Sequence, residues 1–211
     1  MYVKLYYFFD PLCGWCHGFS NVFEKLRANY RNVDFHLVCG GMILGKSEGY
    51  LGEKGKNILH VLPRVSSITG GEFGDAYKSV LETGNLYCSS YKPSLALVII
   101  KKLYPKKVFD TILFLQKTMF QDGISLENEH VYNELSEFLG LDTARIWALM
   151  NEEKWHDFLK QDFELTANVG IQGFPTLVAE IQDKLHLVTH GWNSYDYVEN
   201  VLAELMTMEN A

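Results

Sequence analysis

Two cysteines, Cys13 and Cys16, lie where an apolar run gives way to a helical pattern. The run Val3 to Phe9 is typical of a buried strand, and the turn signal Asp10-Pro11 ends it. From Gly14 to about Tyr30, apolar residues recur at helical spacing. The chain must therefore adopt a fold that places both thiols on the first turn of a helix, beside the end of a strand.

This placement suits disulfide exchange, which needs a thiolate, an accessible sulfur and a resolving thiol within reach. Cys13 at the helix start faces unpaired N–H groups and the positive end of the helix dipole, which favour its thiolate. Cys16 lies one turn further in, so we expect it to stay a thiol until it resolves a mixed disulfide. The motif predicts a redox-active Cys13–Cys16 pair.

The order of elements indicates the fold. Residues 33–39 alternate in polarity and stop at Gly40-Gly41, which completes a β-α-β unit with parallel strands. The middle of the chain, 45–168, reads as helical throughout. Strand character returns at 176–181 and 185–189, across a turn, before a last helix. The remaining β-α-β … β-β-α order is the minimal topology of a thioredoxin-like fold.

We therefore expect an α/β chain with a thioredoxin-like domain at residues 1–44 and 166–211. A large all-helical insertion should occupy residues 45–165. It leaves the sheet just after Cys39, at the carboxyl edge that carries Cys13, so it should overhang the cysteine pair.

A second marker, Gly173-Phe174-Pro175-Thr176, lies just before a predicted strand. A proline that opens a strand is compatible with a cis peptide, although an ordinary loop proline is the alternative. A cis bond would turn the Phe174 backbone outward, where it could pair with an extended substrate peptide.

The cysteine pair, the Phe174-Pro175-Thr176 loop and the insertion between them resemble the DsbA family of the thioredoxin superfamily. The run Asp10-Pro-Leu-Cys-Gly-Trp-Cys-His17 is most similar to its cytoplasmic branch of protein-disulfide isomerases. The resemblance implies that Cys13 attacks and Cys16 resolves. It also implies a substrate groove around a cis-proline, made by Gly14, Trp15, Phe174, Pro175 and Thr176.

Two departures from the family pattern matter. No histidine stands between the cysteines, which implies a less oxidising couple than in the periplasmic members. Tyr7 occupies the position of the buried acid of thioredoxins, so another group must accept the proton of the resolving thiol. Asp10, His17 and His36 are the candidates. His17 is also interpreted as an exposed helix residue, or as a modulator of Cys13.

Other chemistries fit the cysteines less well. Cys-x-x-Cys-His at residues 13–17 is also a haem-attachment pattern, but an export signal and a haem pocket are not evident. Zinc would need a second ligand pair. We therefore expect no metal and no organic cofactor, with glutathione as a conceivable co-substrate. Cys39 and Cys88 are interpreted as structural thiols, with a redox role for Cys39 as the alternative.

The formal net charge of −7 argues against a nucleic-acid partner. The apolar run Leu5 to Phe9 is shorter than the roughly 7–15 residues of the apolar core of a signal peptide. No run approaches the roughly 20 apolar residues of a membrane span. These features predict a cytoplasmic protein without membrane contacts.

The sequence thus predicts a thiol-disulfide oxidoreductase or protein-disulfide isomerase. Its partners would be protein or peptide disulfides and dithiols, and a cellular thiol reductant or oxidant. One rival is a glutathione-dependent transferase or isomerase of the kappa or hydroxychromene-carboxylate type, although those enzymes carry serine in place of Cys13. Another is a non-catalytic binding module. For Trp192, a place beside the Pro175 loop and a role as a buried anchor stay equally open.

Overall fold

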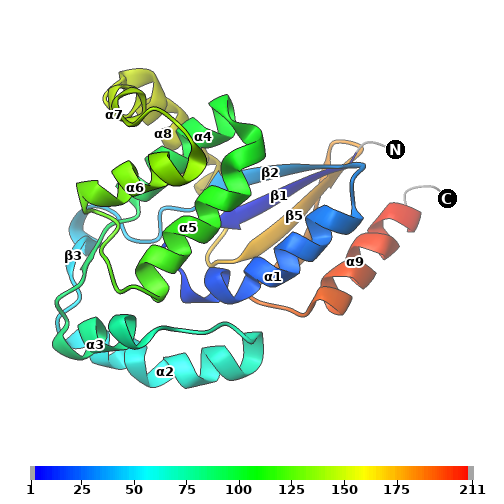
Figure 1. Cartoon of the computed structure of the whole chain (residues 1–211). Helices are drawn as coiled ribbons and strands as arrows, with labels where there is room; N and C mark the ends of the chain where they lie inside the picture. The colour runs from blue at the N-terminus through cyan, green and yellow to red at the C-terminus, as the bar shows by residue number, and fades with distance from the viewer. Residues whose placement is uncertain (1–2, 209–211) are drawn as a thin grey trace.

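The computed structural model describes residues 3–208, and Figure 1 shows a twisted sheet surrounded by helices. The sheet has four strands in the order β2-β1-β5-β6. β1 runs parallel to β2 and antiparallel to β5, and β5 pairs antiparallel with β6. The strands are β1 (Val3–Phe9), β2 (Val33–Cys39), β5 (Thr176–Ile181) and β6 (Lys184–His190). This arrangement confirms the thioredoxin-like α/β fold.

Alternation along β1 divides its side chains between two cores. Leu5, Tyr7 and Phe9 belong to the larger core, together with side chains of α1 (Gly14–Asn29) and α9 (Tyr195–Met208). Phe8 points to the opposite face, where it packs with Val38 and Val178 in a smaller cluster. α1 and α9 lie side by side on one face of the sheet. The sheet therefore fixes the strand end from which the cysteine loop leaves.

The inserted block is mainly helical, as expected, but it also contains a small sheet. The pair β3 (Gly49–Tyr50) and β4 (Tyr87–Cys88) is antiparallel. Strands of two residues are too short to show alternation, so the sequence did not reveal them. The helices of the block are α2 (Glu53–Thr69), α3 (Asp75–Thr83), α4 (Tyr91–Leu103), α5 (Val108–Phe120), α6 (Glu129–Leu139), α7 (Thr143–Met150) and α8 (Glu153–Asn168).

Local details of the block agree in part with the sequence. The apolar run 95–100 is helical within α4, and Asp142 caps α7 by accepting from Arg145 N. Pro105 opens a separate 3₁₀ turn, Pro105–Lys107, ahead of α5. Asn128 rather than Ser125 caps α6, because the Ser125 hydroxyl instead donates to the Tyr87 carbonyl.

α8 crosses the expected boundary between residues 165 and 166. It packs against β2 and therefore joins the block to the sheet. Its Asp162 accepts a hydrogen bond from the Cys39 amide at 2.9 Å. Among residues 3–208, no helix combines the length and apolar character needed to cross a membrane.

Candidate redox site

Cys13 is the N-cap residue of α1. Its backbone is extended, and its sulfur accepts a hydrogen bond from the Cys16 amide at 3.4 Å. The Cys13 amide in turn donates to the Asp10 carbonyl at 3.1 Å, which closes the turn after β1. The sulfur thus lies at the unpaired N–H end of the helix, as the spacing predicted, and the Cys13 residue is 5% exposed.

Cys16 lies one turn further in and is fully buried. Burial raises the pKa of its thiol well above the usual value, and the neighbouring Cys13 sulfur raises it further. All four cysteines are free thiols in this structure. Burial also raises the pKa of Cys39, and raises that of Cys88 to about 12. These three thiols are therefore protonated at neutral pH.

The Phe174-Pro175 loop lies directly against Cys13. The Cys13 thiol donates to the Phe174 carbonyl at 3.3 Å, and the Phe174–Pro175 peptide bond is cis. The Gly191 amide donates to the Pro175 carbonyl at 2.7 Å, so the chain after β6 supports this loop. Two segments more than a hundred positions apart in the sequence are thus in contact at the Cys13 sulfur.

Thr176 was expected to contact substrate, but the structure buries this residue. Its side chain is fully buried, and its hydroxyl donates to the Gly173 carbonyl and lies 3.2 Å from Nδ1 of His190. Thr176 is the first residue of β5, which pairs with β1 on one side and β6 on the other. It therefore positions the Phe174-Pro175 turn that precedes it.

Gly40 is a site residue that sequence reasoning missed. A Cβ atom at this position would overlap the tip of the Phe174 ring, so glycine lets that ring approach the end of β2 closely. The Gly40-Gly41 pair had been noted only as a strand terminator. Two residues on, Met42 is an apolar side chain that is 42% exposed.

Gly14 and Trp15 lie between the two cysteines and are partly exposed. A Cβ on Gly14 would stand 3.6 Å from the Phe73 ring, which comes from the loop between α2 and α3. Trp15 packs partly against the main core. The inserted block therefore reaches the cysteine turn, as expected from the point at which it leaves the sheet.

His17 is not the exposed helix residue that the sequence suggested. Its ring packs against Phe73 and Phe120, at centroid distances of 5.3 and 5.0 Å, and its Nε2 contacts the Glu72 carbonyl at 2.8 Å. Burial lowers its pKa. The block folds over this side chain because both phenylalanines belong to it. His17 thus joins α1 to the block.

Asp10 is the buried acid of this site. It is completely buried, and its carboxylate accepts hydrogen bonds from the Leu12 amide at 2.9 Å, the Met42 amide at 2.7 Å and the Ser90 hydroxyl at 3.0 Å. Burial raises its pKa to about 6. Its main chain donates to the Cys16 sulfur, and its charge acts to raise the pKa of that thiol.

The other candidate proton acceptors are placed less favourably. His36 contacts Asp34 at 2.8 Å and stacks on Tyr6, on the sheet face opposite the main core. Tyr7 is fully buried, and within residues 3–208 its hydroxyl has no hydrogen-bond partner at normal distance. Burial raises the pKa of the Tyr7 hydroxyl well above the usual value, and the Cys16 and Cys13 sulfurs raise it further. Asp10 is therefore the group best placed to serve Cys16.

Trp192 is half-buried and packs against the main core. Its indole donates to the Gly18 carbonyl at 3.1 Å, which anchors it to α1. It directly follows Gly191, the residue that supports Pro175. Within residues 3–208, His, Cys, Asp and Glu side chains form no group of three or more that could hold a metal ion.

Comparison with solved structures identifies the fold. A proposed protein disulfide isomerase from Nitrosomonas europaea is 25% identical, with a TM-score of 0.87 over 99% of each chain. The cytosolic disulfide reductase DsbM from Pseudomonas aeruginosa is 22% identical, with a TM-score of 0.78 over 97% of this chain and 99% of DsbM. The structure of DsbM with GSH is 24% identical, with a TM-score of 0.76 over 99% of this chain and 100% of DsbM.

The sequence comparisons agree. The ClpXP adapter protein SpxH of Halalkalibacterium halodurans is 23% identical over 184 residues, which are 83% of this chain and 58% of SpxH. The chain thus spans 58% of the length of that relative. The family model described as thioredoxin matches residues 6–200, nearly the whole chain. The protein belongs to the thioredoxin family that this model describes.

Proposed function

We propose that this protein is a cytoplasmic thiol-disulfide oxidoreductase in which Cys13 is the nucleophile and Cys16 the resolving thiol. The observation that carries this proposal is the position of the Cys13 sulfur. It caps α1, lies 3.3 Å from the Phe174 carbonyl and has Cys16 one helical turn behind it. A backbone N–H of an extended substrate could replace the Cys13 thiol as the donor to this carbonyl. The substrate would then pair with the Phe174 backbone, with its sulfur beside the Cys13 sulfur.

The reaction proceeds in two exchanges. The Cys13 thiolate attacks one sulfur of a substrate disulfide, the substrate S–S bond breaks, and the released substrate sulfur takes up a proton. The Cys16 thiol then loses its proton to Asp10, and its thiolate attacks the Cys13 sulfur. A Cys13–Cys16 disulfide forms, the second substrate thiol leaves, and two electrons have passed to the substrate.

Asp10 suits this step because it is buried near Cys16 and is ionised above a pH of about 6. Removal of the thiol proton is then possible without water entering the site. The cycle closes when a cellular dithiol or glutathione reduces the Cys13–Cys16 disulfide. Run in reverse, the same steps oxidise a substrate dithiol; stopped at the mixed disulfide, they allow isomerisation.

Insulin reduction, driven by glutathione and glutathione reductase, tests the proposal. Cys13→Ser should abolish turnover, while Cys16→Ser should accumulate a mixed disulfide detectable by mass spectrometry. Cys88→Ser is the matched control, because Cys88 is a buried thiol outside the pair. Full turnover by Cys13→Ser would remove Cys13 from the reaction, and no turnover by the wild type would instead favour a binding module. Glutathione transfer to a small electrophile that survives Cys16→Ser would favour the glutathione-dependent transferase or isomerase class.

Asp10→Asn tests the proton acceptor. The amide cannot take up the thiol proton, so the mixed disulfide should persist longer than in the wild type while its formation continues. If Asp10→Asn resolves the mixed disulfide as fast as the wild type at neutral pH, Asp10 is excluded from the step.

A further inference from the structure

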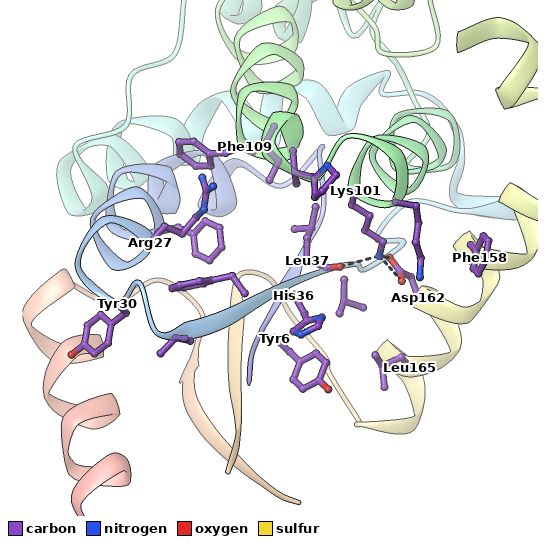
Figure 2. A pocket seen from close by; sticks show the side chains of 18 of the residues that line it. Tyr6, Arg27, Tyr30, His36, Leu37, Lys101, Phe109, Phe158, Asp162 and Leu165 are labelled. Atoms are coloured by element: carbon purple, nitrogen blue, oxygen red, sulfur yellow. Dashed lines mark hydrogen bonds and ion pairs between the residues drawn. The ribbon is translucent and has the colours of Figure 1, made fainter. Parts of the chain in front are cut away.

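β2 is an edge strand of the sheet, and a groove of about 570 Å³ runs along its free side. Figure 2 shows the groove between α1 and α5, which carry Arg27 and Phe109, and α8, which carries Phe158 and Asp162. We call it the β2-edge groove. The residues that line it include Arg27, Arg31, Phe35, Lys101, Lys102 and Asp162.

One end of the strand edge is already closed by side chains. The Gly40 amide donates to the Phe9 carbonyl, so even-numbered residues of β2 bond to β1 and odd-numbered ones face outward. At the outward positions, Lys101 Nζ donates to the Leu37 carbonyl at 2.9 Å. Asp162 accepts from the Cys39 amide, and Thr166 donates to the Cys39 carbonyl.

The rest of the edge is open. The amide and carbonyl of Phe35 and the amide of Leu37 point into the β2-edge groove, and within residues 3–208 no hydrogen bond closes them. Unpaired groups on an edge strand form a template for another extended backbone. The groove thus offers a short ladder between two side-chain walls.

The walls carry positive charge in a chain whose net charge is −7. Arg27, Arg31 and Lys102 line the groove, and in the described part of the chain none of them forms an ion pair. The Arg27 guanidinium lies over the Phe109 ring at 4.8 Å and the Lys102 ammonium over Phe158 at 4.7 Å. Lys101, by contrast, is neutralised by Asp162.

We propose that the β2-edge groove binds an extended acidic segment of a protein partner, which adds a strand beside β2. The free backbone groups select an extended peptide, and the unpaired cations select acidic side chains that flank it. A second copy of this chain fits less well, because edge-to-edge pairing would bring the cations of both copies together. The site lies away from Cys13 and does not depend on its chemistry.

Cysteine-free peptides test the proposal. The probe is a short capped peptide of alternating Glu and Val, followed by fluorescence anisotropy with the Cys13→Ser protein, so that disulfide exchange plays no part. It should bind, whereas the same peptide with Lys in place of Glu should bind about tenfold more weakly or worse. Replacing the central Val with Pro, which removes a backbone donor, should also weaken binding.

A double charge reversal, R31E with K102E, should weaken binding of the Glu peptide about tenfold. Both side chains are exposed, so the fold should be kept. The matched control is K54E with R64E, which reverses two exposed cations of α2 outside the groove and should change affinity less than about twofold. Circular dichroism of both variants verifies folding.

Amide hydrogen exchange locates the bound peptide. Saturating Glu peptide should slow exchange of the Phe35 and Leu37 amides about tenfold. Unchanged exchange at both amides would overturn the proposal. Equal binding of the Lys peptide and the Glu peptide would also overturn it. If citrate displaced the Glu peptide fully but did not protect these amides, the groove would be a simple anion site, which would overturn the proposal too. If the Phe35 and Leu37 amides were protected without peptide, and more so at higher protein concentration, the β2 edge would instead bind a second copy of this chain.

Discussion

The Cys13 thiol donates to the carbonyl of Phe174, a residue 161 positions later in the chain. This contact joins the two parts of the site, because Cys13 caps the helix that follows β1 and Phe174 precedes β5. Both strands are neighbours in the sheet. The pairing of β1 with β5 therefore sets the distance between the nucleophile and the backbone that would hold its substrate.

Alkylation should distinguish the four cysteines. Iodoacetamide applied to the reduced protein at neutral pH should label Cys13 first, because its sulfur is the least deeply buried and caps a helix N-terminus. Cys16, Cys39 and Cys88 should lag, because burial raises the pKa of each. Peptide mass spectrometry measures the order, with Cys13→Ser as the control. Faster labelling of Cys16 would reverse the roles assigned to the pair.

Gly40→Ala should impair turnover through Phe174. The new methyl group overlaps the tip of the aromatic ring, so the ring must shift, and this should disturb the Phe174 carbonyl beside the Cys13 sulfur. Overpacking of this kind also destabilises a fold by about 1–3 kcal/mol. Insulin reduction and thermal unfolding measure the two effects.

A second substitution separates steric overlap from general damage at this position. Adding Phe174→Leu to Gly40→Ala removes the ring and should restore part of the lost stability. Additive losses in the double variant would mean that Gly40 does not act through Phe174.

Asp10 should make stability depend on pH. An unfolded aspartate ionises near 3.8, whereas burial raises the folded pKa to about 6. The stabilising contribution of the protonated form is complete below pH 3.8 and is lost as pH rises through about 6. The loss corresponds to about 3 kcal/mol. Denaturant unfolding between these values should show it, and Asp10→Asn should remove this part of the slope.

The Lys101–Asp162 pair should respond asymmetrically to mutation. Both side chains are largely buried, and their atoms lie 2.5 Å apart. Lys101→Met leaves Asp162 without its cation and should destabilise the fold by about 3–5 kcal/mol. The double variant Lys101→Met with Asp162→Asn should lose less than the sum of the single losses. Denaturant midpoints of the four proteins complete the cycle, and strict additivity would show that the pair is not coupled.

The sequence predicted the sheet and the meeting of Cys13 with the Pro175 loop because both rest on strong local patterns. Apolar runs mark the strands, and a cysteine pair marks the helix start. Asp10 was one of three candidate acceptors, because burial near Cys16 arises only from packing against Ser90 and Met42. The role of Gly40 was hidden for the same reason, since its ring partner is distant in sequence. His17 was misjudged because Phe73 and Phe120 cover it from the block.

The placement of β5 beside β1 has a consequence during synthesis on the ribosome. Val3 pairs with Ile181, so the central strand waits for almost the whole chain before its second neighbour exists. The helical block can assemble in the meantime, because its contacts are largely local. A nascent chain therefore carries Cys13 long before Phe174 leaves the ribosome. During that interval the nascent chain holds reactive thiols without a completed substrate groove. Disulfide exchange by the finished protein begins only once the last fifth of the chain has folded back onto the first strand.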